Sequence, residues 1–291
     1  MTYAGVELGG TKCIAILARD ADDVLARESI PTTSPEQTIG RVEEILLGWK
    51  ARDPFDALGI ASFGPIDVDP GSPTYGHMRA TTKPGWTHTD VASRLRQTTG
   101  VPTELDTDVN GAAFAEMRWG CGRGFDDFAY ITVGTGVGVG LIVNGKATRG
   151  FGHCELGHMR VARMAGDDWP GSCPFHRDCV EGIAAGSSLK ARFGEDIDKL
   201  APDHPVWDSV VWALAQLCHA IVLAAAPRRI AIGGGVVARQ PHLLARIETR
   251  LVESLNGFID LPGDVAYIRA PELGGDAGPL GAIALAMKAR P

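Results

Sequence analysis

Two turns of glycine and threonine, each lying between apolar runs, most constrain how this chain can fold. The first, Gly9–Lys12, interrupts an apolar stretch over residues 3–18, and the second, Gly134–Gly138, interrupts one over residues 128–143. Apolar runs on both sides of a tight turn are typical of paired strands. The recurrence predicts a duplicated α/β architecture of two related domains, with a boundary near residue 112.

The other segments are typical of alternating helices and strands. A helix is predicted to begin after Ser34, because Pro35 suits the first helical position and a glutamine lies three residues after the cap. Further helices are expected at 90–98, 109–119, 206–226, 241–258 and 276–289, and further strands at 57–63, 101–106 and 229–232. We expect a smaller N-terminal domain over 1–112, on which the C-terminal segment 276–291 packs back, and a larger domain over 113–275.

Glycine is in excess, at 37 of 291 residues, against an average near 7%. Much of the excess lies in the two turns and in Gly233–Gly235. Concave rows of backbone N–H groups in such turns bind anions, phosphates above all. The residues alone leave two alternatives open. Each turn is also typical of a plain tight hairpin connection. Gly233–Ala238 also matches a dinucleotide-binding fingerprint, with Glu253 about 20 residues on, although Glu253 lies in a predicted helix.

Composition restricts the class of protein further. The net charge of −7 argues against a nucleic-acid partner, because duplex-binding surfaces are usually basic. The N-terminus lacks the pattern of a signal peptide, and no apolar run approaches the about 20 residues of a membrane helix. Six scattered cysteines do not suit a disulfide scaffold. We expect a cytoplasmic protein with reduced thiols, and with Cys13, Cys121 and Cys218 in its core.

Asp106, Asp108 and Asn110 lie where a predicted strand opens into a predicted helix. Aspartate is ionised at neutral pH and can accept a proton from a hydroxyl group. It is also a preferred N-cap residue, and spacing alone favours a cap at Asp106 or Asp108. A catalytic carboxylate and a helix cap therefore both stay open at this point.

A cluster of cysteine and histidine lies between residues 153 and 179. Cys173, His176 and Cys179 are spaced as C-x-x-H-x-x-C, which is typical of a zinc loop, and a fourth N or S ligand would close a tetrahedral site. Spacing leaves that ligand open among three residues: His153, Cys154 and His158. Unrelated buried thiols and imidazoles are the alternative.

The Gly- and Pro-rich segment 65–86 is long for a plain connection, and long loops are often functional. Lys83 is a candidate for a phosphate or sugar contact, although a solvated loop lysine is the more common case. Trp86 could stack on a sugar, but a large aromatic side chain is usually buried. Asp167 and Asp168 are interpreted as a solvated loop.

Five motifs resemble the motif series of the ROK sugar kinases, which have the actin/hexokinase-like ATPase fold. They are E-L-G-G-T-K (7–12), D-T-D-V-N (106–110), V-G-T-G-V-G (133–138), E-L-G-H (155–158) and I-G-G-G-V (232–236). Four others resemble the bacterial fructokinase branch: S-F-G-P-I-D (62–67), P-T-Y-G (73–76), T-K-P-G-W (82–86) and C-P-F-H-R-D-C (173–179). The resemblance covers nearly the whole chain. It implies two actin-like (ribonuclease H-like) domains with a cleft between them and a zinc loop at about 153–180.

The resemblance also implies residue roles. Asp108 would be the catalytic base. The residues implied to bind the sugar are Asn110, Glu155, His158, Glu181 and Gly64. Those implied to face ATP are Gly9, Gly10, Thr11, Lys12, Gly134, Thr135, Gly136, Gly233, Gly234, Gly235, Val236 and Val237. The implied zinc ligands are His158, Cys173, His176 and Cys179. Glu7 stands where many family members have Asp, and the resemblance implies a contact with Mg²⁺ through water.

The activity implied is ATP- and Mg²⁺-dependent phosphorylation of a hexose at its 6-hydroxyl, with D-fructose as the first choice. Glucose, mannose or an N-acetylated hexosamine is the alternative substrate. A sugar-sensing regulator of the same family is the alternative of another class. Such regulators carry an N-terminal helix-turn-helix, whereas this chain starts directly at the first glycine motif. The family also suggests a homodimer, without nucleic-acid or membrane partners.

Overall fold

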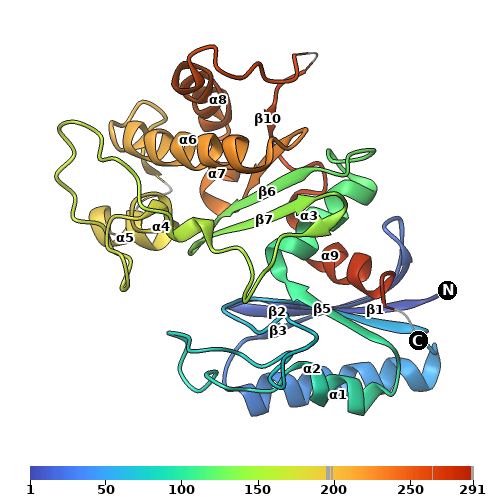
Figure 1. Ribbon diagram of the computed structural model, residues 1–291. Helices are drawn as coiled ribbons and strands as arrows, with labels where there is room; N and C mark the ends of the chain where they lie inside the picture. The colour runs from blue at the N-terminus through green and yellow to red at the C-terminus, as the bar shows by residue number, and fades with distance from the viewer. Residues whose placement is uncertain (195–196, 198, 264, 290–291) are drawn as a thin grey trace. The chain divides into compact units, whose positions relative to one another are not determined.

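The computed structural model describes residues 1–289 except 195, 196, 198 and 264. The chain forms two compact units (Figure 1). Unit 1 comprises Met1–Arg123, Ala147–His153 and Gly275–Pro291, and unit 2 comprises Gly124–Lys146 and Cys154–Gly274. The expected boundary at residue 112 lies inside helix α3 (Asp108–Trp119). The chain first leaves unit 1 after Arg123, because a helix packed on the unit 1 sheet is not divided between two cores.

Unit 1 is built on a five-stranded sheet in the order β3-β2-β1-β4-β5. The strands are β1 (Tyr3–Leu8), β2 (Lys12–Asp20), β3 (Asp23–Pro31), β4 (Ala57–Ser62) and β5 (Thr103–Thr107). β1, β2 and β3 are antiparallel neighbours, whereas β1, β4 and β5 run parallel. β3 was not predicted, because Ile30 is its one buried residue and the strand has no apolar alternation.

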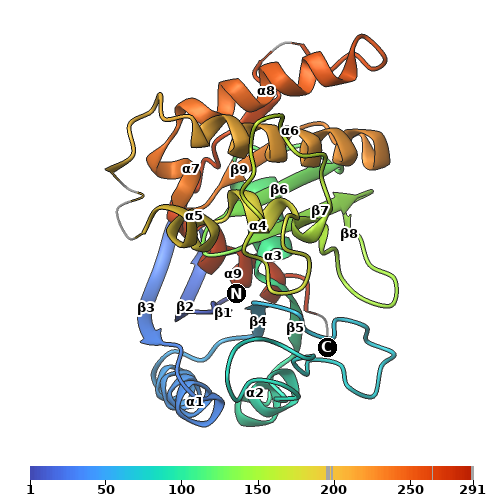
Figure 2. The ribbon, with the colours of Figure 1, turned by 90° about the vertical axis from the view of Figure 1, so that its left-hand side faces the viewer.

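Helices cover both faces of this sheet (Figure 2). They are α1 (Pro35–Arg52), α2 (Ala92–Thr99), α3 and α9 (Ala277–Ala286). Ser34 is the N-cap of α1, as predicted, and accepts a hydrogen bond from the Gln37 N–H. α9 contacts β1, β4 and α3, so the C-terminal helix belongs to unit 1. Gly59 permits this approach, because a Cβ there would lie 1.9 Å from the Ala282 carbonyl oxygen.

Unit 2 repeats the strand order in its own sheet, β10-β9-β6-β7-β8. Its strands are β6 (Phe128–Val133), β7 (Val137–Val143), β8 (Lys146–Ala147), β9 (Ile230–Gly233) and β10 (Ile268–Arg269). Its helices are α4 (Val180–Ala184), α5 (Gly186–Phe193), α6 (Val206–Ala225), α7 (Gly235–Arg239) and α8 (His242–Leu255). β6 pairs antiparallel with β7 and parallel with β9, as β1 does with β2 and β4. The duplicated sheet pattern is therefore present.

α6 is long and apolar enough to cross a membrane by length and composition, with a mean hydropathy of 1.6 over its window. A helix is predicted here, at 206–226, but its length and hydropathy contradict the expectation that no apolar run approaches that of a membrane helix. More than half of that window, 56%, is buried, and α6 packs against α4 and α8. A buried core helix passes the same test, so α6 is weak evidence for a membrane span.

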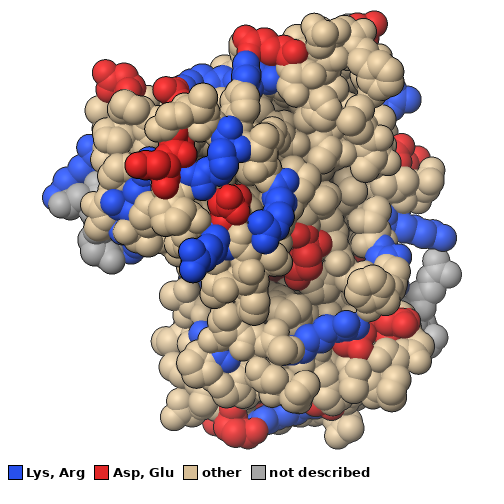
Figure 3. All heavy atoms as spheres, turned by 60° about the vertical axis from the view of Figure 1, so that its left-hand side comes forward, with Lys and Arg blue, Asp and Glu red and all other residues tan. Residues whose placement is uncertain are grey.

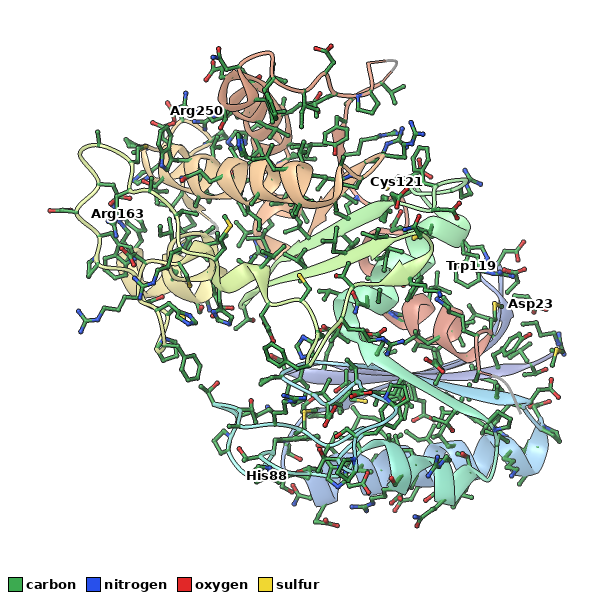
Figure 4. The ribbon with its side chains drawn as sticks, viewed as in Figure 1. Asp23, His88, Trp119, Cys121, Arg163 and Arg250 are labelled. Carbon is green, nitrogen blue, oxygen red and sulfur yellow. The ribbon has the colours of Figure 1, made fainter. Side chains whose placement is uncertain are left out.

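The thiols expected in the core are buried: Cys13, Cys121 and Cys218. Cys121 follows the end of α3, close to Trp119 (Figure 4). Trp86 is 0% exposed and donates its indole N–H to the Thr33 carbonyl at 2.8 Å, which confirms its core position. Acidic and basic side chains are interspersed over the face shown in Figure 3.

Candidate active site

Three parallel strands of unit 1 end beside residues predicted for the site, and these strand ends lie at one sheet edge. β1, β4 and β5 are parallel, so their carboxyl ends lie at the same edge of the sheet. Gly9 follows β1, Gly64 comes two residues after β4, and Asp108 follows β5. The Phe63 N–H donates to the Leu8 carbonyl at 2.7 Å, which ties the first two of these strand ends together. This is the edge at which open parallel sheets commonly bind ligands.

The first glycine turn is tight and open to solvent. The Gly9 N–H donates to the Lys12 carbonyl at 3.1 Å, and the Gly9 carbonyl accepts from the Thr32 hydroxyl at 2.7 Å. A Cβ on Gly10 would meet no atom within 4 Å. Lys83 donates its ammonium to the Gly10 carbonyl at 2.5 Å. Lys83 therefore lies against this turn and is not a free loop lysine.

The β5–α3 junction separates the roles of three neighbouring polar residues. Thr107 is the N-cap of α3, and its hydroxyl accepts from the Asn110 N–H. The alternative that Asp106 or Asp108 caps the helix is therefore wrong. Asp108 is the first helical residue, is half-buried and accepts from the Val109 N–H at 2.9 Å. Thr107 occupies the N-cap position, where its hydroxyl can accept from a free N–H group of the first turn.

Glu7 lies on β1, where its carboxylate faces the first turn of α9. A Cβ on Gly278 would lie 2.1 Å from Glu7 Oε1, so a glycine in α9 makes room for the carboxylate. Burial raises the pKa of Glu7, against the charges of Lys12 and Arg27, which lower it. A partly desolvated carboxylate gains from a cation, and oxygen is the ligand atom that Mg²⁺ prefers. The residue fits the implied magnesium contact.

In unit 2, β6 and β9 are parallel, and the second and third glycine clusters follow them. Gly234 has φ +87°, and a Cβ there would lie 2.5 Å from the Val133 N and O atoms. The N–H of Gly186, the first residue of α5, donates to the Gly134 carbonyl at 2.7 Å. Ser187 donates its hydroxyl to the Thr135 carbonyl at 2.7 Å. Both turns and the start of α5 are thus held at one sheet edge.

The dinucleotide-binding alternative for Gly233–Ala238 is wrong. Glu253 lies in α8, more than half exposed, and pairs with Arg250 at 2.7 Å. Arg250 lies at the periphery of unit 2 (Figure 4). A ribose-binding carboxylate would follow a strand at the sheet edge. The sheet also pairs β6 antiparallel with β7, which a doubly wound dinucleotide-binding sheet does not do at its centre.

Glu181 links the second turn to the predicted zinc loop. Its Oε2 accepts from the Val137 N–H at 3.1 Å, and its Oε1 lies 3.9 Å from His158 Nδ1. A Cβ on Gly136 would lie 2.6 Å from Glu181 Oε2, so the Glu181 carboxylate packs directly against this turn. Glu155 is exposed and directly precedes the short 3₁₀ turn Leu156–His158. Three predicted sugar-binding residues of unit 2 therefore share one region.

Four side chains converge on a geometry suited to zinc: His158, Cys173, His176 and Cys179. Their ligand atoms all lie within 4.8 Å of one another. Cys173 Sγ is 3.6 Å from His158 Nδ1 and 3.8 Å from His176 Nδ1. Bonds of about 2.0–2.3 Å to a tetrahedral zinc place its ligands about 3.3–3.8 Å apart. Both thiols are buried, and the donor set fits a closed structural site.

The two other candidates for the fourth ligand lie outside this group. His153 belongs to unit 1, where its Nε2 accepts from the Ile66 N–H at 3.2 Å. Cys154 is half-buried and is not part of the four-residue cluster. Spacing could not decide among the three, because the choice depends on a loop that returns along η1 (Leu156–His158) to α4.

Two carboxylates have roles that the sequence did not suggest. Asp67 accepts from the Ser72 and Thr74 hydroxyls, each at 2.7 Å, and so organises the long loop after Gly64. Asp167 is not solvated: its side chain is 4% exposed and lies 3.0 Å from Arg192 and 3.7 Å from Arg163. Arg163 is labelled in Figure 4. Asp168 is exposed, as predicted.

The chain is similar over nearly its whole length to known proteins of one family. The family model described as "ROK family" matches residues 3–289. The chain is 38% identical to a fructokinase of Pediococcus pentosaceus over 99% of both chains. It is 36% identical to a protein named "Putative fructokinase" of Bacillus subtilis, over 98% of this chain and 95% of that one. The crystal structure of a ROK hexokinase from Thermus thermophilus superposes with a TM-score of 0.78 at 26% identity, over 99% and 98% of the two chains. The chain belongs to the ROK family.

Proposed function

We propose that this protein is an ATP-dependent hexose kinase that converts D-fructose to D-fructose 6-phosphate. The observation that carries the proposal is the β5–α3 junction, which places Asp108 and Asn110 at the sheet edge where the first glycine turn also lies. Relatives named as fructokinases, at 36% and 38% identity over nearly the whole chain, support the fructose substrate.

Asp108 is the proposed general base. Its carboxylate takes the proton of the sugar 6-hydroxyl while that oxygen attacks the γ-phosphorus, and the bond to the β,γ-bridging oxygen of ATP breaks to release ADP. Phosphoryl transfer otherwise depends on positioning and on neutralising charge. The backbone N–H groups near Gly10, Gly134 and Gly235 are proposed to face the phosphates and the adenosine. Mg²⁺, when bound, neutralises phosphate charge, and Glu7 is proposed to contact it through water.

The resemblance implies sugar contacts at five residues, which we propose for this chain: Asn110, Gly64, Glu155, His158 and Glu181. Zinc in the four-residue cluster would bind His158 through Nδ1, the nitrogen that lies near both thiols. Nε2 would then remain as an N–H donor toward a sugar hydroxyl. A metal-bound imidazole keeps one orientation and one tautomer, so a structural zinc would also position the substrate.

A coupled ADP-release assay over a panel of sugars tests the proposal. We expect ADP release with fructose to exceed that with glucose, mannose and N-acetylglucosamine. A preference for one of these other sugars would favour the alternative branch of the family. No release with any hexose would contradict the proposal. ADP release by the Asp108→Asn variant, purified in the same way, measures the activity of contaminating kinases.

Two further proposals rest on the family resemblance. We propose that the protein is cytoplasmic and that two chains of 30.8 kDa form a homodimer. Light scattering after size-exclusion chromatography measures the mass directly, and a single-chain mass would contradict the dimer.

A further inference from the structure

The side chain of Asn110 has one polar atom that forms a hydrogen bond and one that no described residue pairs with. Its Nδ2 donates to Asp106 Oδ1 at 2.7 Å. Its Oδ1 is buried and has no hydrogen-bond partner among the described residues. A carboxylate oxygen accepts hydrogen bonds, so the NH₂ group of the amide has to face Asp106. The orientation of Asn110 therefore follows from its neighbour.

Asp106 is itself held at a single position. It lies on β5, is 3% exposed and accepts a second hydrogen bond, from the Thr107 N–H at 2.8 Å. Both donors reach the same oxygen, Oδ1. Strand β5 thus fixes the carboxylate, and the carboxylate fixes the amide of Asn110 in the first turn of α3.

A buried carbonyl oxygen without a partner is costly, and native proteins seldom retain one without a function. Packing alone does not require the Asp106–Asn110 pair, because an apolar pair of similar size would fill the same space without the cost of desolvating a carboxylate. The pair leaves an acceptor uncommitted two residues after Asp108. Because the oxygen is buried, a bound hydroxyl group would satisfy that acceptor once the atoms that cover it move aside.

We infer that Asp106 is a positioning residue, which holds the Asn110 amide so that Oδ1 accepts a hydrogen bond from a hydroxyl group of the sugar. The inference rests on the proposed sugar kinase activity. It adds that the sugar hydroxyl donates the hydrogen bond and that Asn110 accepts it. The enzyme selects a hydroxyl that donates at this point, and Asp106 acts on the substrate only through Asn110.

A double-mutant cycle on Asp106→Ala and Asn110→Ala tests this inference, with fructose KM, ATP KM, kcat and thermal midpoint measured for each variant. We expect Asp106→Ala to raise the fructose KM about 10- to 100-fold, as for the loss of one charge-assisted hydrogen bond, with the ATP KM little changed. In the Asn110→Ala background the same substitution should leave the fructose KM unchanged, although it still lowers the thermal midpoint.

The conservative Asp106→Asn variant keeps an acceptor oxygen and should stay within about threefold of the wild-type fructose KM. Leu105→Val is the matched structural control, because Leu105 is a buried β5 residue of the hydrophobic core. It should lower the thermal midpoint without changing the fructose KM. If Asp106→Ala does not fold, Asp106→Ser takes its place in the cycle.

Independent, additive effects of the two substitutions on the fructose KM would overturn the inference, as would an unchanged KM in Asp106→Ala. If the wild-type enzyme phosphorylates fructose, either of these results with the variants would leave the proposed function intact. Absence of sugar-dependent ADP release in the wild type would instead contradict the proposed function itself.

Discussion

Individual carboxylates of this chain differ in pKa because their burial and their hydrogen-bond partners differ. Burial raises the pKa of Glu7. At Asp67, burial also acts upward, but hydrogen bonds from Ser72, Thr74 and the Asp69 N–H, with the charge of Arg79, outweigh it and lower the pKa to about 2. Glu7 is therefore suited to binding a cation, whereas Asp67 stabilises the loop that contains Ser72 and Thr74.

Asp108 is expected to be essential for turnover and dispensable for folding. Asp108→Asn should lower kcat about 10²–10⁴-fold, the usual contribution of a general base, with little change in thermal midpoint. Steady-state kinetics and a thermal melt check both expectations. Near wild-type turnover in purified Asp108→Ala would show that another group takes the proton.

Asp67 is expected to make unfolding sensitive to acid. Because its folded pKa of about 2 lies below the ordinary value of 3.8, its contribution is fully present above about pH 5 and is lost as the pH falls toward 2. The difference corresponds to about 2 kcal/mol at pH 7. Urea unfolding at several pH values between 7 and 3 should show a weaker acid loss in Asp67→Asn than in wild type.

Asp22→Asn is the control for that experiment, since Asp22 is an exposed residue of the β2–β3 turn. It should follow the wild-type pH dependence. The same acid loss in Asp67→Asn as in wild type would mean that another carboxylate is responsible.

Close packing between helices and strands depends on glycines at the points of contact. A local sequence pattern does not show that glycine is required there. Gly59 of β4 lies against α9, and Gly281 of α9 lies against α3, where a Cβ would come within 2.4 Å of the Gly111 carbonyl carbon. Helix α9 can therefore lie directly on β1 and β4. The position of the C-terminal helix depends on these glycines as much as on its apolar residues.

Gly59→Ala and Gly48→Ala should have opposite effects on stability. A methyl group at Gly59 overlaps the α9 backbone and should destabilise unit 1 by about 1–3 kcal/mol or more. Gly48 is exposed in α1, and a Cβ there meets nothing within 4 Å. Alanine should stabilise that helix by about 0.5–1 kcal/mol. Urea midpoints compare the two variants, and equal shifts would disprove close packing as the cause.

The zinc loop should bind one metal ion per chain. Cys173→Ser or Cys179→Ser should abolish zinc and most activity, because each removes one of four ligands from a buried site. Cys154→Ser is the matched control and should retain zinc, since Cys154 lies outside the cluster. Elemental analysis of protein purified without chelator measures the content. Zinc-free wild-type protein, or zinc loss in Cys154→Ser, would contradict the assignment.

At the scale of the whole molecule, the net charge and the two similar sheets indicate which kinds of ligand suit this chain. The net charge of −7 opposes a polyanion that needs an extended basic surface. It does not oppose ATP, whose phosphates would meet local backbone N–H groups and Mg²⁺. The two sheets share one strand order, and each presents glycine turns at the ends of parallel strands.

The protein is therefore expected not to bind duplex DNA. Electrophoretic mobility in low salt, where electrostatic binding is strongest, should show no retarded complex at micromolar protein. Retardation that is lost on adding fructose would revive the sugar-sensing regulator.

The amino-acid sequence by itself determined the two glycine turns, most strands, the capped start of α1 and three of the four cluster residues. These depend on short-range requirements, namely apolar period, cap chemistry and ligand spacing, which a local pattern expresses. The tertiary structure decided the exposed strand β3 and the burial of Asp167. It also groups His158, the ligand that the resemblance implied, and not His153, with the other three cluster residues. Each of these depends on a neighbour brought close by folding: His153 is bound by Ile66, 87 positions away, and no local pattern encodes such a contact.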